Sequence, residues 1–147
     1  MKIILTISLL LLCAFCRSGD NLTILNNKID LIKFDCWLNL MLGGKPSFHY
    51  AGEIKVDTLL INKFSFREVV ILNNKKTIHK SKPILEKINI ENQSEIYTGN
   101  FIFLSPYGIE VNEEMMKVNT INVLIKFVID KKEIPIMLND IELIRAY

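Results

Sequence analysis

The sequence predicts an all-β domain, and three observations support this prediction. Apolar and polar residues alternate through most of the chain after residue 30, the period-two pattern of strands with one face in a core. Clusters of Asn, Asp, Gly and Lys interrupt this pattern about every ten residues, as turns do. Beyond residue 16, no stretch has a convincing helical period. We expect a single antiparallel two-sheet β-sandwich with an immunoglobulin-like topology; the alternative is a small β-barrel.

The longest alternating run predicts a strand over residues 30–42. Phe34, Cys36 and Leu38 belong to its apolar face, and Trp37 lies on the other face. A Gly-Gly-Lys-Pro sequence follows and ends the strand as a turn. The remaining strands are predicted at residues 50–61, 64–72, 77–79, 84–90, 100–105, 109–111, 121–129, 134–138 and 141–147.

Other parts of the chain have a less regular pattern. Residues 84–90 also permit one helical turn, and residues 112–117 are predicted as a helical turn or a loop. Pro83 restricts its neighbourhood to a sheet edge or a loop. Asn139-Asp140 is predicted as a turn between the last two strands.

Length and charge limit the classes of function. The chain has 147 residues, and residues 30–147 have the size of one domain with a hydrophobic core of its own. The formal net charge is +2, and the basic residues are scattered along the chain. This pattern does not indicate nucleic acid as a partner.

Residues 1–16 have the organisation of a cleavable export signal. Lys2 precedes an apolar run, and small or short side chains follow that run. As a helix the run rises about 15 Å, roughly half of a bilayer's hydrocarbon core, which is too short for a stable span. We therefore expect a signal helix at residues 1–16 and a polar tether at residues 17–29.

Residues 9–16, a leucine-rich run that ends in a cysteine, resemble the signal of a bacterial lipoprotein. The resemblance implies that Cys16 becomes the first residue of the mature chain and carries a lipid. It also implies a membrane anchor and a location in the bacterial cell envelope, at the outer membrane or in the periplasm. The residues before it, Cys13-Ala14-Phe15, lack the leucine that this family usually has three positions before the cysteine. Cys13 is the second candidate, and the alternative is ordinary cleavage after Cys16 with secretion of the chain.

Cysteine use predicts no disulfide within the mature chain. If Cys16 is lipidated or lost, Cys36 has no partner, whereas a cut before Cys13 would leave Cys16 free to pair with Cys36. We expect Cys36 to be a small buried hydrophobic residue.

No residue pattern predicts catalysis, a cofactor or a metal site. His49 and His79 lie far apart without zinc-ligand spacing, so both are expected at the surface or the rim. The serines have no sequence link to either histidine, and the acidic pairs fall in polar turns. We therefore expect a protein that is not an enzyme.

The methionines indicate one alternative, a copper carrier. Met41, Met115, Met116 and Met137, together with a histidine, have the soft ligands that copper prefers. They form no tight cluster in the sequence, however. Met41 and Met137 fall in strand patterns, so we expect these two side chains in the core.

An exposed aromatic patch is the strongest candidate for binding. It combines Trp37 with Phe48, His49 and Tyr50, and the competing interpretation is that these side chains pack against neighbouring strands or loops. The leading hypothesis is an exported, lipid-anchored envelope protein whose non-catalytic domain binds an unknown envelope protein or serves structurally. The alternatives are a soluble periplasmic carrier of a ligand or of copper, and a small secreted inhibitor or immunity protein.

Overall fold

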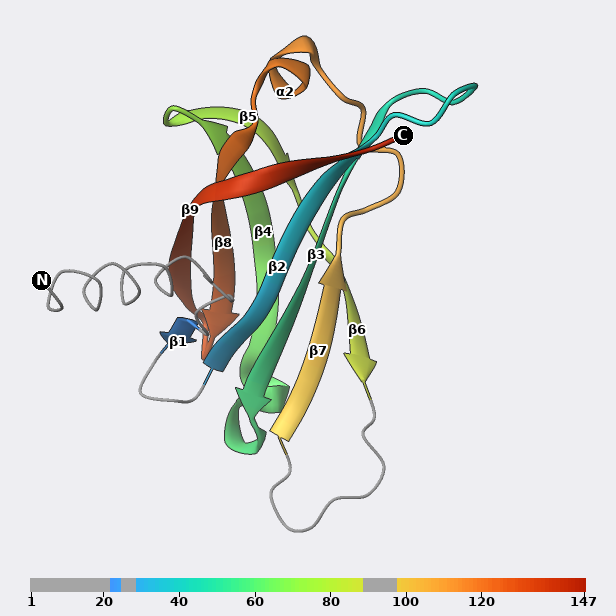
Figure 1. Ribbon diagram of the computed structural model, residues 1–147. Helices are drawn as coiled ribbons and strands as arrows, with labels where there is room; N and C mark the ends of the chain where they lie inside the picture. The colour runs from blue at the N-terminus through green and yellow to red at the C-terminus, as the bar shows by residue number, and fades with distance from the viewer. Residues whose placement is uncertain (1–21, 25–28, 89–97) are drawn as a thin grey trace, which may run out of the picture.

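The computed structural model describes residues 22–24, 29–88 and 98–147 (Figure 1). The predicted signal, with Cys16, lies outside the described residues. Leu22–Ile24, inside the predicted tether, form a short strand. The described elements are β1 (Leu22–Ile24), β2 (Ile29–Asn39), β3 (Ser47–Asp57), the 3-10 helix η1 (Thr58–Lys63), β4 (Phe64–Asn73), β5 (Lys76–Ser81), β6 (Ile84–Ile88), β7 (Thr98–Leu104), the helix α2 (Glu113–Lys117), β8 (Thr120–Ile129) and β9 (Lys132–Ala146).

All the described strands belong to one curled sheet. Its order is β5-β4-β8-β9-β2-β3-β7-β6, and β1 pairs with β2 beside this path. Neighbouring strands are antiparallel except β2 and β9, which are parallel. The sheet curls into a half-barrel, so that β4 and β8 face β3 and β7 (Figure 1). We call these the β4 half and the β3 half.

Strand β9 joins the two halves. Residues 132–142 pair with β8, and residues 143–146 pair with β2. Within the part paired with β8, the register shifts between Leu138 and Ile141, and Asp140 in this stretch has a positive φ of 54°. The Asp140 N–H donates to Asn122 Oδ1 at 2.9 Å. Asn139-Asp140, predicted as a turn between two strands, is therefore a bulge that bends one long strand.

The predicted all-β class is confirmed, whereas the two-sheet immunoglobulin-like sandwich is not. Because β9 belongs to both halves, the sheet is continuous, and it contains one parallel pair in addition to the antiparallel ones. The strand predicted at residues 109–111 is absent, since this stretch forms only an isolated bridge between Ser47 and Glu110. Several strand limits also differ from the prediction. β2 ends at Asn39 rather than at residue 42, and the second predicted strand gives way to η1, which the Asp57 side chain caps by accepting from the Leu59 N–H.

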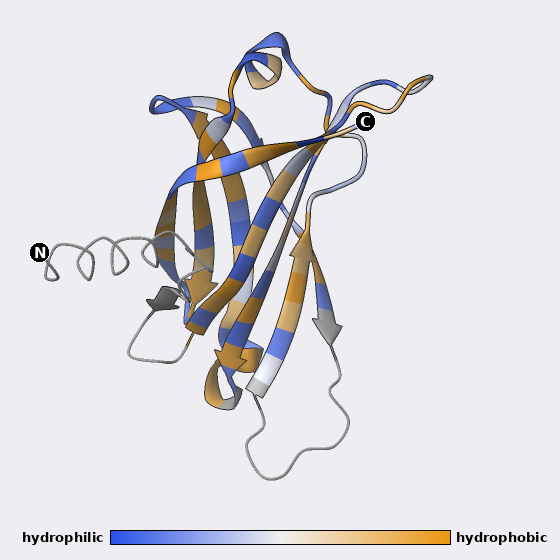
Figure 2. Cartoon of the chain, viewed as in Figure 1, coloured by the Kyte–Doolittle hydropathy of each residue, from blue (hydrophilic) through white to orange (hydrophobic). Residues whose placement is uncertain are grey.

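The core lies between the two halves and is rich in aromatic rings. Orange and blue segments alternate along β2, β4 and β8 in Figure 2, as expected for strands with one buried face. The ring of Phe66 in β4 lies 4.6 Å from that of Phe103 in β7 and 4.8 Å from that of Phe127 in β8, measured between centroids. Phe66 therefore connects the two halves across the core.

Tyr50 forms a polar link inside this core. Its hydroxyl oxygen lies 2.9 Å from Ser81 Oγ at the end of β5, and its N–H donates to Ser105 Oγ at 3.2 Å. Burial raises the pKa of the Tyr50 phenol to about 12, so the phenol stays protonated. Tyr50 thus ties β3 to β5. Pro83 lies in the connection between the two edge strands β5 and β6, in agreement with the sheet edge or loop predicted around this proline.

Cys36 is fully buried, as predicted, and its Sγ donates to the carbonyl oxygen of Glu142 at 3.4 Å. Burial raises the pKa of this thiol to about 12. Because the thiolate is the reactive species, we expect folded protein that begins at residue 17 to resist iodoacetamide at about pH 8 and to react fully in denaturant. Mass spectrometry of the alkylated protein checks this, and rapid alkylation of the folded chain would contradict it.

Candidate functional site

Trp37 and His49 form a stacked pair on the outer face of the β3 half. They are register partners on β2 and β3, and their ring centroids lie 5.5 Å apart with an interplanar angle of 14°. His49 Nε2 shares a hydrogen bond with Ser47 Oγ at 2.8 Å, which fixes the imidazole against the indole. Both side chains are half-buried, so part of each ring faces solvent.

The other two residues of the predicted patch do not belong to it. Phe48 and Tyr50 are fully buried, so their prediction as exposed binding residues is wrong. The reason is the period of the strand: residues 47, 49 and 51 of β3 point outward, while residues 48 and 50 point into the core. Three consecutive ring-bearing residues of one strand cannot share a face.

Apolar side chains of neighbouring strands extend the Trp37–His49 pair. Ile144 of β9 is opposite Trp37 and is 50% exposed, and Leu104 of β7 lies between Ala51 and Ile84. We call this surface the Trp37 face; it consists of Trp37, His49, Ala51, Ile84, Leu104 and Ile144. Sequence reasoning missed Ile144, Leu104 and Ile84, since only strand pairing brings them beside Trp37.

An ion pair borders the Trp37 face. Lys33 Nζ lies 2.6 Å from Asp35 Oδ2, and the two side chains are 67% and 40% exposed. The hydrogen bond and charge of Asp35 raise the pKa of Lys33. An apolar area with a charged border is the usual composition of a protein-binding surface.

A second apolar surface lies at the end of the molecule that carries the β2–β3 connection. We call it the hairpin end; it consists of Met41, Leu42, Tyr107 and Tyr147, all exposed. The Leu40 N–H donates to the Ala146 carbonyl at 2.7 Å, and the Phe48 N–H donates to the Ile109 carbonyl at 3.0 Å. These bonds hold the C-terminal residues and the loop after β7 beside the connection.

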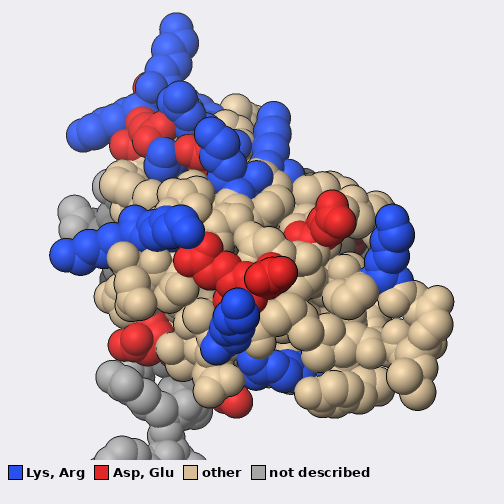
Figure 3. Space-filling model, turned by 90° about the horizontal axis from the view of Figure 1, so that it is seen from above, with Lys and Arg blue, Asp and Glu red and all other residues tan. Residues whose placement is uncertain are grey.

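In the figures the hairpin end stands out from the body. Figure 1 shows the β2–β3 connection projecting beyond the sheet, next to the C-terminus. Figure 3 looks down on this end, and the lobe at its right consists mostly of tan, uncharged side chains. Met41, which belongs to the hairpin end, is 61% exposed, and Met137 on β9 is 46% exposed, so the expectation that both are core residues is wrong. Met41 follows the end of β2, and Met137 points outward from the sheet beside Leu124.

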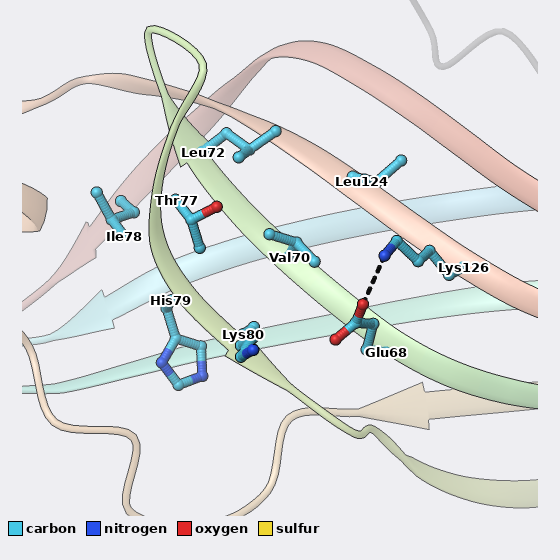
Figure 4. A pocket seen from close by; sticks show the side chains of 9 residues that line it. All are labelled: Glu68, Val70, Leu72, Thr77, Ile78, His79, Lys80, Leu124 and Lys126. Atoms are coloured by element: carbon cyan, nitrogen blue, oxygen red, sulfur yellow. Dashed lines mark hydrogen bonds and ion pairs between the residues drawn. The ribbon is translucent and has the colours of Figure 1, made fainter.

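A hollow of about 590 Å³ lies on the outer face of the β4 half (Figure 4). Val70 and Leu124 lie in the middle of it, and Thr77 and Lys80 reach toward it from β5. At one end Lys126 Nζ donates to Glu68 Oε1 at 2.6 Å. Lys126 also lies 3.8 Å from Glu133 Oε1. Arg67 Nη1 lies 2.7 Å from Glu133 Oε2, so two basic and two acidic side chains compensate one another at this end of the hollow.

In Glu68→Gln, the free energy of unfolding is expected to fall less steeply than in the wild type as the pH is lowered below 4.5. The hydrogen bond from Lys126 lowers the pKa of Glu68 below its ordinary value of 4.5. Between the lowered pKa and 4.5 the unfolded chain binds more protons than the folded chain. The contribution of Glu68 is therefore present above pH 4.5 and is lost as the pH falls through the lowered pKa.

Urea unfolding between about pH 7 and about pH 3 checks this expectation. The difference in free energy of unfolding between wild type and Glu68→Gln should shrink as the pH falls below 4.5. Ser65→Ala, an uncharged change at an exposed position of the same strand, should give a constant difference. A Glu68→Gln difference that stays equally constant would contradict the role of the ion pair.

Each histidine lies on a strand that carries no methionine, and Met115 and Met116 are neighbours on α2. His79 is half-buried in β5 with its ring 6.4 Å from that of Phe48, and burial lowers its pKa. Its Nε2 is buried and has no hydrogen-bond partner among the described atoms. Met115 is a core residue of α2, far along the chain from Met41. Within the described ranges, no three His, Cys, Asp or Glu side chains gather into a group that could hold a metal ion.

None of the helices within the described ranges is long and apolar enough to cross a membrane. Comparisons with known protein families, with curated proteins and with solved structures found no match.

Proposed function

We propose that this protein is an exported, lipid-anchored protein of the bacterial cell envelope whose β domain binds another protein without catalysis. The signal-like residues 1–16 and the cysteine at their end support export and anchoring at Cys16. As part of the proposal, the two facing halves of the sheet act as an immunoglobulin-like scaffold that presents its outer face to a partner.

The Trp37 face is the observation that supports the proposal that the β domain binds another protein. Tryptophan is enriched among the residues that contribute most to protein–protein affinity, and it contributes best in the middle of an apolar area. Here Trp37 is held by His49 on one side and flanked by the exposed Ile144 on the other. Such a preformed aromatic surface loses little conformational entropy when a partner covers it.

Metabolic labelling with a palmitate analogue tests the anchor. Expressed in a bacterial host with its own signal, the wild type and Cys13→Ala should both incorporate label, whereas Cys16→Ala should not. Absence of label on the wild type, under conditions that label a known lipoprotein, would overturn the anchor. Labelling of Cys16→Ala equal to that of the wild type would mean that the lipid is attached to another residue.

Site-specific photo-crosslinking in the producing cell tests the binding surface. Ile144 and Met137 form a matched pair, because both point outward from β9, at 50% and 46% exposure, and lie in different halves of the sheet. A photoreactive residue at position 144 should give one discrete adduct that Trp37→Ala diminishes, and position 137 should give none. Equal adducts at both positions, or none at position 144, would contradict the proposal.

A further inference from the structure

We propose further that the β2–β3 connection inserts Leu42 into the lipid leaflet to which Cys16 is anchored, so that the domain sits on the membrane at two points. This inference concerns the hairpin end, which the binding proposal does not use, and it rests on the lipid anchor proposed above. Three features of the described residues carry it: the geometry of the turn, the chemistry around it and the direction of β1.

The turn places Leu42 at its apex, clear of the body. The Gly44 N–H donates to the Met41 carbonyl at 3.4 Å, which closes a four-residue turn with Leu42 and Gly43 in the centre. Gly43 has a φ of 91°, as the third position of a type II turn requires. A side chain added at Gly43 would meet no atom within 4 Å. Leu42 is fully exposed, and nothing in the described fold requires a leucine at this apex.

The residues around the apex are those expected at a membrane surface. Leu42 and Met41 form the apolar tip, and the exposed Tyr107 and Tyr147 lie behind it. Lys45 follows the turn and is exposed. Apolar side chains favour the hydrocarbon, tyrosine the membrane–water interface, and lysine extends its ammonium group to the headgroups. A narrow projecting tip suits insertion into lipid, whereas the Trp37 face, on the outer surface of the sheet, suits a folded partner.

The direction of β1 allows the lipid on Cys16 and the side chain of Leu42 to reach the same leaflet. β1 is antiparallel to β2, with Leu22 opposite Leu31 and Ile24 opposite Ile29, so the chain enters β1 from the side of the hairpin end. From Leu22 back to Cys16 the chain can span up to about 20 Å. The stretch of β2 from Leu31 to Asn39 is about 26 Å long. A tilted domain can therefore place the lipid on Cys16 and the tip at Leu42 in one leaflet.

Quenching of a fluorophore by nitroxide-labelled lipids tests the insertion. The lipidated chain is reconstituted into vesicles of phosphatidylethanolamine and phosphatidylglycerol, with a fluorophore on Lys45→Cys or, as the matched control, on Asn62→Cys. Asn62 is exposed on η1, at the other end of β3, and the native Cys36 is buried, so we expect it not to react. Position 45 should be quenched severalfold more strongly than position 62.

Two further substitutions, each combined with the fluorophore at position 45, distinguish insertion of Leu42 from mere proximity of the hairpin end to the membrane. Leu42→Asp should reduce quenching at position 45 to the level of position 62. Leu59→Asp, at a side chain that is 79% exposed on η1, should leave it unchanged. Equal quenching at both positions, or quenching that survives Leu42→Asp, would overturn the insertion and leave the hairpin end as a surface for a protein.

The mass of the reconstituted protein distinguishes this failure from failure of the anchor. If the purified chain carries the lipid but position 45 is not quenched, only the insertion is overturned. If the chain exported by the bacterial host carries no lipid, the anchor and the inference that rests on it are both overturned.

Discussion

Gly52→Ala is expected to lower the free energy of unfolding by about 3 kcal/mol, at the upper end of the usual cost of overpacking a core. Gly52 of β3 is the register partner of Phe103 of β7, and the Phe103 ring lies directly over it. A β-carbon at residue 52 would overlap this ring, and both residues are buried where the two halves of the sheet meet. Either the ring moves into its aromatic neighbours or β3 and β7 separate.

Urea unfolding followed by the fluorescence of Trp37, the single tryptophan, measures this loss. Gly44→Ala is the matched control, because a β-carbon there comes no closer than 3.9 Å to another atom. Adding Phe103→Leu to Gly52→Ala should make the combined loss smaller than the sum of the single losses, since a smaller side chain leaves room for the methyl group. A Gly52→Ala variant within about 0.5 kcal/mol of the wild type would contradict this packing.

Phe66→Ala is expected to cost about 3–5 kcal/mol, a large share of the stability of a domain of this size. Phe66 touches Phe103 of the opposite half and Phe127 of its own half, and its ring also lies 5.4 Å from that of Phe64. Its removal leaves a cavity at the centre of the core. Phe66→Leu should cost clearly less, because leucine fills part of that space.

Thermal or urea unfolding of Phe66→Ala beside Ser65→Ala checks the expectation. Ser65 is the exposed neighbour of Phe66 on β4, so its truncation should change the free energy of unfolding by less than about 0.5 kcal/mol. Similar losses for the two variants would mean that the two halves of the sheet do not pack through Phe66.

The strands that the sequence predicts well are those whose alternation is local and strict. β8 runs over Thr120–Ile129, close to the predicted range, because every second residue from Ile121 to Ile129 is apolar and buried. Asn139-Asp140 was not predictable in the same way. Asn and Asp tolerate a positive φ in a turn and in a bulge alike, so local composition cannot separate two short strands from one bent strand.

The parallel pairing of β2 with β9 depends on contacts between distant parts of the chain. No local pattern near Cys36 or Leu143 identifies the other as its neighbour, although both are buried and adjacent in the sheet. Because the sequence does not reveal the pairing of β2 with β9, the fold predicted from it has two separate sheets instead of one continuous sheet.

The candidate site was predictable only in part, for the same reason. Trp37 was identified from its place on the polar side of its strand, and the phase of β3 could have excluded Phe48 and Tyr50. The sequence around Ile144 does not indicate that this residue belongs to the Trp37 face. Its place there depends on the pairing of β9 with β2, which brings Ile144 beside Trp37. The exposed tip at Leu42 was not predicted, because the alternating apolar pattern continues past Asn39 to residue 42. The strand itself ends at Asn39.

The central claim, a lipid-anchored envelope protein, is tested most directly by the mass of the N-terminal peptide of protein recovered from the membranes of a bacterial host. We predict a peptide that begins at Cys16 and carries the added mass of the lipid. An unmodified peptide that begins at Arg17 or later would contradict the anchor and indicate a secreted, soluble protein.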